Sequence, residues 1–467
     1  MPDKKWFSFR RNRSDTTEAE KAPQLRPANE NPWYCLATLH GEQPMDGNWD
    51  QELAEKNRVA WDRWIGADGA NRNELADIFA RRTSKSLTLP EPKTPADFSH
   101  TRFDRPLNLA GFRFVWPADF RSAVFVGETS FQNAVFNSKA DFSSATFSRE
   151  TNFGGVHLDA GADFQSVTFA RSVHFQRAYL TNINFRSATF SGAANFHDTN
   201  FHGNDLAIFY RATFSGEATF VGAKFPSGAG FDGVTFSMST SFDGAKFKEV
   251  SFKTATFSGH IQFVDATFDG PANFAFARFE AQPPDLRGAE MHEATAWHGV
   301  IWPRPAMNED AQQQVYAYER LKQEMERLKK HEDEQHVFRM ELRARRGLLR
   351  IFSGEWLLNL AYQCLSNYGI SYIRPVLWLV AIFVAAFGIF THAPLYCGAP
   401  MPTKLAINLS LANIFVFLPN QRILLTKMAT ANCLSDTTQV VSAVEALLSV
   451  VLLFLLGLAL RNRFRMR

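Results

Sequence analysis

A large apolar residue, most often Phe, recurs every five or six residues from about Ala118 to Phe279. On an α-helix, a five-residue step turns about 140° around the axis, so these side chains would share no face. On one continuous strand, an odd step places successive side chains on opposite faces. The pattern therefore predicts very short extended segments separated by corners, in which steps of five and six combine into an eleven-residue unit.

A second set of regularly spaced residues supports the prediction of short segments separated by corners. Two positions before nearly every large residue stands a small or β-branched one, as in Ala-Asp-Phe at 140–142 and 162–164 and Ala-Asn-Phe at 194–196. Residues two apart on an extended segment point to the same side. Each segment thus directs one small and one large side chain inward, while the Ser, Gly, Asn, Asp, Thr and Lys residues between them suit exposed corners.

The phenylalanines that keep this spacing form the predicted core ladder. Burying one Phe is worth roughly 1.5–3 kcal/mol, so stacked columns of Phe would offset the entropy lost on ordering the chain. A disordered Phe-rich tract is the alternative, and disordered chains avoid such a density of large apolar residues. The ladder comprises Phe120, Phe125, Phe131, Phe136, Phe142, Phe147, Phe153, Phe164, Phe169, Phe175, Phe185, Phe190, Phe196, Phe214, Phe220 and Phe225.

The inward pair with a polar residue between its members resembles the pentapeptide-repeat family. The resemblance covers residues 98–290 and implies an all-β solenoid, namely a right-handed four-sided β-helix. Phe stands here where the family more commonly has Leu, and the extra residue in alternate units departs from a strict period of five. We therefore expect bulged corners and about 22 residues per coil rather than about 20.

Composition excludes several classes of function. A net charge of +3 over 467 residues is too small to argue for a polyanionic partner, so no nucleic acid partner is expected. Acids and bases nearly balance within the repeat, whereas some pentapeptide-repeat proteins use an acidic surface to mimic DNA. The sequence contains no phosphate-binding glycine loop, metal-ligand cluster or nucleophile elbow. We expect no enzymatic activity, no cofactor and no metal.

The region before the repeat divides in two. Residues 1–30 are polar and charged, which predicts a disordered basic arm that stays in the cytoplasm, with a membrane-surface or nucleic-acid contact as the alternative role. Residues 31–97 predict an N-terminal cap over the open edge of the first coil. In this cap we expect a short apolar strand or turn at 31–39 and a helix beginning at Asp50. A binding cleft lined by Trp residues is the alternative.

After the repeat, residues 291–307 contain Trp297 and Trp302 and predict a plug and linker at the end of the solenoid. Residues 308–346 predict one heavily charged helix with acids at its start. Its apolar stripe spans two heptads, too few for a coiled coil, so we expect a solvated helix leaning on the solenoid.

Residues 373–467 predict a two-span transmembrane region. The stretches 375–394 and 440–460 are almost entirely apolar and long enough to cross a bilayer. The preceding segment 347–372 predicts an amphipathic helix lying on the membrane surface. The basic residues expected at that surface are Arg343, Arg345, Arg346 and Arg350.

Arginines gather before the first span and after the second, which predicts a multi-pass protein of the cell inner (plasma) membrane with both ends and the β-helix in the cytoplasm. The loop 395–439 then lies outside, in an oxidising compartment. Cys397 and Cys433 stand near its two ends and are a candidate disulfide, with two free thiols as the alternative.

From Tyr318 onward the chain is similar to bacterial pentapeptide-repeat membrane proteins with a C-terminal two-helix transmembrane region. The segments Tyr368–Ser371, Arg374–Trp378 and Phe454–Arg465 carry this resemblance. It implies no defined biochemical activity.

A short apolar segment at 405–418 ends at Pro419 and cannot span a bilayer. Two spans with such a segment between them outline a two-helix cation channel, but no glycine-containing filter follows it. Glu445, near the start of the second span, could line a pore or lie among lipid headgroups.

The sequence thus predicts a membrane-anchored scaffold whose cytoplasmic β-helix presents flat faces to an unknown protein partner. The alternative is an oligomeric ion channel, a candidate homo-oligomer, in which the β-helix acts as a cytoplasmic gate or sensor.

Overall fold

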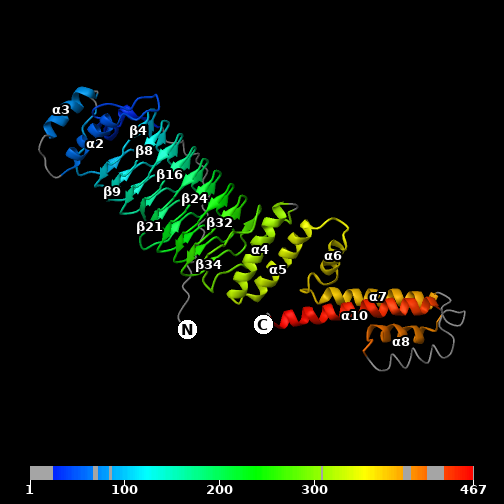
Figure 1. Ribbon diagram of the computed structural model, residues 1–467. Helices are drawn as coiled ribbons and strands as arrows, with labels where there is room; N and C mark the ends of the chain where they lie inside the picture. Colours follow the sequence, from blue (N-terminus) through cyan, green and yellow to red (C-terminus); the bar gives the residue numbers. More distant parts are fainter. Residues whose placement is uncertain are drawn as a thin grey trace, which may run out of the picture. The chain divides into compact units, whose positions relative to one another are not determined.

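The computed structural model describes residues 25–66, 72–83, 87–306, 309–392, 401–417 and 436–465. The chain divides into two compact units, Met1–Ser191 and Gly192–Arg467. Both units contain coils of a β-solenoid built from strands of two or three residues, with a corner after each strand (Figure 1). Each unit has strands in four parallel sheets, so the solenoid has the four faces that the family resemblance implies.

The sheets of the first unit take one strand from each successive coil. The first sheet contains β1 (Arg26–Pro27), β3 (Thr101–Phe103), β7 (Val124–Phe125), β11 (Thr146–Phe147), β15 (Thr168–Phe169) and β19 (Thr189–Phe190). The second contains β2 (Ala96–Asp97), β6 (Ala118–Asp119), β10 (Ala140–Asp141), β14 (Ala162–Asp163) and β18 (Ile183–Asn184). The third contains β4 (Leu107–Asn108), β8 (Thr129–Ser130), β12 (Thr151–Asn152) and β16 (Val173–His174). The fourth contains β5 (Arg113–Phe114), β9 (Val135–Phe136), β13 (His157–Leu158) and β17 (Tyr179–Thr181).

The second unit repeats this arrangement. One sheet contains β23 (Thr213–Phe214), β27 (Thr235–Phe236), β31 (Thr256–Phe257) and β35 (Arg278–Phe279), and the next β22 (Ala207–Ile208), β26 (Ala229–Gly230), β30 (Val250–Ser251) and β34 (Ala272–Asn273). The others contain β20 (Ala194–Asn195), β24 (Ala218–Thr219), β28 (Thr240–Ser241) and β32 (Ile261–Gln262), and β21 (Asn200–His202), β25 (Lys224–Phe225), β29 (Lys246–Phe247) and β33 (Thr267–Phe268). Single bridges continue the pairing to Ile301, past residue 290, where the sequence-based boundary lay.

The register matches the expected coil length. Ala118 pairs with Ala140, and Ala140 with Ala162, which is a step of 22 residues per coil. The next pair, Ala162 with Ile183, is one residue shorter.

The alternation of five and six residues comes from two kinds of corner. A tight turn after Phe142 is closed by a 3.0 Å hydrogen bond from the Ala145 amide to the Phe142 carbonyl, and it brings the chain to Phe147 in five residues. Ser144 in this turn is left-handed, with a φ of 58°. The following corner, from Phe147 to Phe153, takes one residue more. Each eleven-residue unit therefore contains one tight and one wide corner.

The interior of the solenoid is filled by stacked aromatic rings. Every phenylalanine of the predicted ladder is at most 1% exposed. Rings of neighbouring coils stack almost in parallel, and Phe142 lies 4.7 Å from both Phe120 and Phe164, measured between ring centroids. Rings on adjacent sides meet edge to face, as Phe131 and Phe142 do at 5.4 Å. Such aromatic pairs add about 0.5–1.5 kcal/mol each beyond the burial of their area.

The N-terminal region forms a cap on the first coils. It contains η1 (Ala28–Glu30), α1 (Pro32–Ala37), α2 (Gln51–Ile65) and α3 (Arg72–Arg82). Trp61 of α2 is 1% exposed, and its ring packs 5.5 Å from Phe112 and 5.2 Å from Phe114. Its Nε1 donates a 2.8 Å hydrogen bond to the Arg113 carbonyl. The Trp61 side chain is thus buried where the cap packs on the first coils, and it does not line an open cleft.

Two N-terminal expectations differ from the structure. Residues 31–39 contain helix α1, not a strand, because the Asn31 side chain accepts hydrogen bonds from the Trp33 and Tyr34 amides and Pro32 suits the first helical position. Residues 26–30, expected within the disordered arm, form η1 and strand β1, and β1 pairs with β3. The rest of the arm, residues 1–24, lies outside the described residues.

Two tryptophans close the last coils, as the composition of 291–307 predicts. Trp297 stacks on Phe274 with ring centroids 4.3 Å apart, and Trp302 stacks on Phe279 at 5.5 Å. Tyr318 of α4 (Glu309–Arg327) then meets Trp302 edge to face at 6.1 Å.

The prediction of a single charged helix at 308–346 is wrong. This region forms a helical hairpin of α4 and α5 (His331–Leu348), because the chain turns at Lys329, which is left-handed with a φ of 56°. The apolar stripe of α4 is buried, and an ion pair of 2.5 Å joins Lys322 of α4 to Glu341 of α5. The expected packing against the solenoid is confirmed by the contact of Tyr318 with Trp302. The buried apolar residues of the hairpin include Tyr318, Leu321, Met325, Val337 and Ala344.

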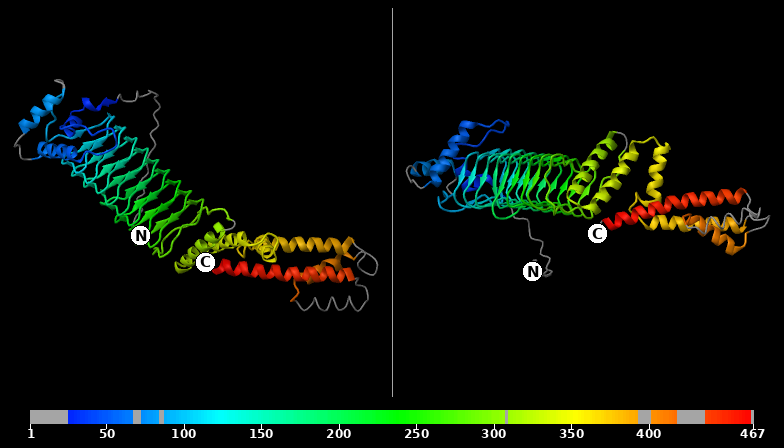
Figure 2. Two further views of the ribbon diagram at one scale, coloured as in Figure 1. Left: turned by 45° about the horizontal axis from the view of Figure 1, so that its top comes forward. Right: turned by 60° about the horizontal axis from the view of Figure 1, so that its bottom comes forward.

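The remaining helices are α6 (Gly354–Ser366), α7 (Ile373–His392), α8 (Thr403–Ile414) and α10 (Asp436–Arg465). Of these, α7 and α10 are long and apolar enough to cross a membrane, by length and composition. They pack side by side (Figures 1 and 2). Asn462 donates a 3.1 Å hydrogen bond to the Gly369 carbonyl, and the Arg463 guanidinium lies 4.8 Å from the Tyr372 ring centroid. The start of α7 and the end of α10 therefore lie together.

Candidate functional site

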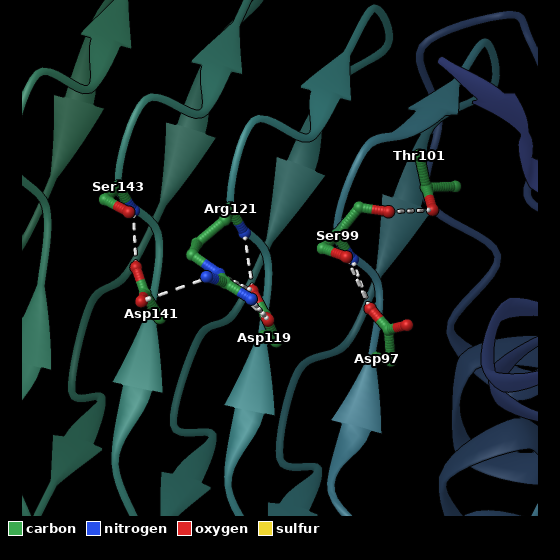
Figure 3. Close-up of polar contacts among 7 residues, drawn as sticks. All are labelled: Asp97, Ser99, Thr101, Asp119, Arg121, Asp141 and Ser143. Carbon is green, nitrogen blue, oxygen red and sulfur yellow. Dashed lines mark hydrogen bonds and ion pairs between the residues drawn. The ribbon is translucent and has the colours of Figure 1, made fainter. Parts of the chain in front are cut away.

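One face of the first unit carries a column of aspartates. Asp97, Asp119, Asp141 and Asp163 occupy paired positions on neighbouring strands. Each Oδ1 accepts a hydrogen bond of 2.9–3.0 Å from the backbone N–H two residues later, as Figure 3 shows for the first three. Such turns fix the corner that follows the strand. The polar residue between the small residue and the Phe therefore caps a corner.

The same carboxylates form a row of negative charge in which Asp97 is exposed and Asp119, Asp141 and Asp163 are half-buried. Arg121 pairs with Asp119, Nη2 to Oδ2 at 2.6 Å, and its Nε lies 3.9 Å from Oδ2 of Asp141 (Figure 3). One guanidinium stands against four carboxylates, so Arg121 only partly offsets the charge of the column. Neighbouring aspartates follow one another at the strand spacing of about 4.8 Å. The column is a regular array to which basic groups of a partner could bind.

Helix α10 carries a buried carboxyl group. Glu445 is 2% exposed and lies against α8. The Ser410 hydroxyl donates to Oε1 of Glu445, and the Asn413 amide nitrogen donates to Oε2 at 2.8 Å. Ser410 and Asn413 are themselves buried. Residues 405–414 of the short apolar segment thus lie in α8, which supplies both hydrogen bonds.

Glu445 belongs to a polar stripe on α10. Thr438, Ser442, Glu445 and Ser449 recur at steps of four, three and four residues, which places them on one helix face. All four are at most 7% exposed. The hydroxyls of Ser442 and Ser449 have no hydrogen-bond partner among the residues that the structure describes. An ionisable group in such an apolar helix is costly and marks a candidate functional position.

The sequence suggested that Glu445 lines a pore or lies among headgroups, and the structure places it between α8 and α10. Sequence reasoning missed its partners Ser410 and Asn413. The available signal was their spacing, since two polar residues three apart in an apolar helix share one face. Spacing alone could not indicate which helix that face meets.

The four arginines expected at the membrane surface differ from one another in their surroundings. Arg345 pairs with Glu319 of α4 and, at 2.8 Å, with Glu341. Arg346 donates to the Gln363 side chain of α6. Arg343 makes no hydrogen bond or ion pair within the described residues, and its Nε is buried. Arg350 is exposed.

The repeated coils also match a known family. A family described as "Pentapeptide repeats (9 copies)" matches residues 109–157, 131–178, 175–224 and 231–278. The chain carries a pentapeptide-repeat domain. No curated protein and no solved structure matches the chain.

The pentapeptide-repeat domain borders a groove in the second unit. The groove has a volume of about 600 Å³ and lies between the β28–β32 face and α4. Its polar lining includes His260, Gln262, Arg287 and Arg320. Among the described residues, no group of three or more His, Cys, Asp or Glu side chains could hold a metal ion.

The cysteines of the predicted disulfide, Cys397 and Cys433, lie outside the described residues, so this disulfide stays a prediction. Cys35 and Cys364 are free thiols. Cys35 lies in the cap of the pentapeptide-repeat domain, where burial raises the pKa of its thiol and makes it less reactive.

Proposed function

We propose that this chain is a membrane-anchored scaffold, which presents its pentapeptide-repeat domain to a protein partner. The exposed apolar surface of α7 and α10 carries the proposal. Only 17% of the most apolar stretch of α7 and 28% of that of α10 is buried, whereas a core helix of a soluble protein is mostly buried. Leu377, Leu447 and Phe454 are 61–70% exposed. A continuous apolar surface of this kind requires lipid or a partner to cover it.

The arginines support an orientation for this anchor. The joined ends of α7 and α10 carry Arg374, Arg461, Arg463 and Arg465. Basic residues next to spans favour the cytoplasmic side. We place these ends, and with them the pentapeptide-repeat domain, on the cytoplasmic side of the inner (plasma) membrane.

The aspartate column is the proposed partner surface. It combines partial solvent access, like charge and regular spacing, which fits a protein segment with basic side chains at intervals of about 4.8 Å. Asn in place of Asp keeps the Oδ1 acceptor of each corner and removes only the charge. Charge and fold can therefore be separated experimentally.

The partner surface is tested with the Asp119→Asn/Asp141→Asn double variant in cells. A photo-reactive residue at Ser143 reports contact with a partner, and the cross-link is expected in the wild type but not in the double variant. Asp265→Asn/Asp269→Asn, which removes two charges elsewhere in the domain, is the control and should retain the cross-link. Equal cross-linking in all three proteins would refute a role for the column.

An ion channel is the second candidate function, and buried Glu445 with the polar stripe on α10 favours it. The burial of Glu445 weighs against it, because the side chain is only 2% exposed and packs against α8, whereas an ion in a pore would have to reach the carboxylate. We therefore place the scaffold first.

Planar-bilayer recording on the purified full chain, together with its mass in detergent, separates the two functions. A monomer without conductance supports the scaffold. An oligomer that conducts ions, with a selectivity that changes on Glu445→Gln, would favour the channel.

A further inference from the structure

One face of α5 carries four basic side chains. His336, Arg339, Arg343 and Arg346 recur at steps of three, four and three residues, which places them on the same side of the helix. Arg374, at the start of α7, joins this group. Burial, followed by the positive charges of Arg343 and Arg374, lowers the pKa of Arg339. The geometry agrees, because Arg346 and Arg374 both donate hydrogen bonds to Gln363 of α6, one to its side chain and the other to its carbonyl.

No carboxylate within the described residues pairs with this cluster. The guanidinium of Arg339 donates to Nδ1 of His336 at 2.9 Å, and Nη1 of Arg374 donates to the Gln363 carbonyl at 2.9 Å. The Nε atoms of Arg339 and Arg343 are buried and have no acceptor in the described part of the chain. A buried donor without an acceptor is costly. The cluster therefore provides unused donors and uncompensated positive charge.

The carboxylate nearest in sequence serves the opposite side of α5. Glu341 is 2% exposed and pairs with Lys322 of α4 and with Arg345. It lies in the seam of the α4–α5 hairpin. Glu332 and Asp333, about one turn before His336, are the acids next to the basic face, and within the described residues neither forms an ion pair with its arginines. An anion from outside the chain would satisfy the free guanidinium donors.

Exposed apolar side chains occur on the helices that pack beside this basic face. Helix α5 contacts α6, and α6 contacts α7. Phe352, just before α6, is 78% exposed, and Leu358 within α6 is 73% exposed. Leu377 and Trp378, one turn after Arg374, are 61% and 44% exposed. Positive charge beside exposed apolar surface fits an amphiphile with an anionic head.

We propose that Arg339, Arg343 and Arg374 bind the phosphate of an anionic phospholipid whose acyl chains lie along α6 and α7. A guanidinium fork matches two phosphate oxygens. Basic pockets at the ends of membrane helices bind anionic headgroups. The apolar side chains next to the guanidiniums favour a lipid over free phosphate. The inference rests on the membrane anchoring proposed above.

The test uses the purified full chain in a neutral detergent and native mass spectrometry. The probes are phosphatidylglycerol, phosphatidylcholine with the same acyl chains, and glycerol 3-phosphate. Arg343→Gln and Arg374→Gln each remove one charge from the cluster. Arg345→Gln removes one charge from the other side of the same helix and is the matched control. Arg343→Lys keeps the positive charge but lacks the two-pronged guanidinium. It is used in place of Arg343→Gln if the Gln variant does not fold.

We expect the wild type and Arg345→Gln to retain phosphatidylglycerol in preference to phosphatidylcholine. Arg343→Gln and Arg374→Gln should each bind phosphatidylglycerol about fivefold more weakly. Arg343→Lys should also bind less tightly than the wild type, because one guanidinium fork is lost.

Equal binding of phosphatidylglycerol by all variants would overturn the proposal. Displacement of the lipid by an equal concentration of glycerol 3-phosphate would also overturn it, because the acyl chains would then contribute nothing. Insertion into vesicles of phosphatidylcholine alone, judged by resistance to alkaline extraction, tests the anchor separately. Failure of the lipid site leaves that insertion unchanged, whereas failure of the anchor abolishes it.

Discussion

The Asn413 side chain of α8 donates a hydrogen bond of 2.8 Å to the carboxylate of Glu445 in α10. Ser410, one turn earlier in α8, donates to the other carboxylate oxygen. Both donors and the acceptor are almost completely buried. These bonds join a helix too short to span a bilayer to one that is long enough, and they give that short helix a defined position.

Replacing Glu445 by Leu should loosen α8. The substitution leaves two buried donors, Ser410 and Asn413, without their acceptor, at a cost of roughly 1–3 kcal/mol each. We expect a lower melting temperature in detergent and stronger labelling of a cysteine introduced at Leu409. Val444→Leu, at an exposed position next to Glu445, is the control and should change neither. Unchanged labelling in Glu445→Leu would show that the hydrogen bonds do not hold α8.

The repeat could be predicted from sequence because its determinants are local. The step from Phe142 to Phe147 and the Ala-Asp-Phe triplet at 140–142 are both read within one eleven-residue unit. Parallel stacking then repeats each determinant in every coil, so a local pattern specifies the whole solenoid. The coil length of 22 residues followed from the same spacing.

The parts that sequence reasoning missed depend on single residues or on distant partners. A helix start at Asn31 and Pro32 was available as a capping signal, but the apolar residues after it suggested a strand. The turn at Lys329 separates α4 from α5, and it contains no Gly or Pro from which it could have been predicted. The partners of Glu445 come from another helix, and no spacing in α10 predicts them.

Replacing Ser144 by Gly should stabilise the solenoid or leave it unchanged. Ser144 is left-handed, with a φ of 58°, a conformation that costs a residue with a Cβ about 1–2 kcal/mol. Ser143→Gly is the matched control, since Ser143 is not among the left-handed residues and Gly there adds only entropy to the unfolded chain, about 0.5–1 kcal/mol of destabilisation. Denaturant unfolding of the two variants measures the difference. A Ser144→Gly variant less stable than Ser143→Gly would contradict the corner assignment.

Truncating one ring of the ladder should be costly. Phe142 is fully buried and stacks on Phe120 and Phe164, so Phe142→Ala removes contacts in three coils and leaves a cavity. We expect a loss of roughly 3–5 kcal/mol in the free energy of unfolding. Arg149→Ala, at an exposed corner of the same coil, should cost less than about 0.5 kcal/mol. Equal losses would mean that the ladder is not the core.

Stability should fall as pH decreases from about 6.5 toward 4 because of His336. Burial, followed by the charges of Arg339 and Arg343, lowers the pKa of His336 from 6.5 to about 4. The Arg339 guanidinium can only donate, so Nδ1 of His336 must be unprotonated to accept its hydrogen bond. Between these two pH values the unfolded chain binds a proton that the folded chain does not, and this favours unfolding by an amount on the order of 2 kcal/mol.

The His336→Gln variant isolates this effect. Gln can still accept a hydrogen bond from Arg339 but does not titrate. Burial raises the pKa of Asp333, so its protonation stabilises the folded chain as the pH falls. This contribution is present in both proteins and therefore cancels when their stabilities are compared. Urea unfolding at several pH values should show a steeper loss of stability in the wild type above pH 4 and parallel curves below it. Parallel curves over the whole range would mean that His336 is not buried in its neutral form.

The last prediction concerns the side of the membrane on which the chain ends. The hydrogen bond from Asn462 to the Gly369 carbonyl brings the end of α10 to the start of α7, so both lie on the same side if the two helices span. The arginines at this end favour the cytoplasm. A reporter fused after Arg467 should therefore be active only if it functions in the cytoplasm, and a reporter inserted at Ser366 should give the same result. Replacing Arg461, Arg463 and Arg465 by Gln should weaken this preference without preventing insertion. Activity of a reporter that functions only outside the cytoplasm, at either position in the unaltered chain, would refute the proposed orientation.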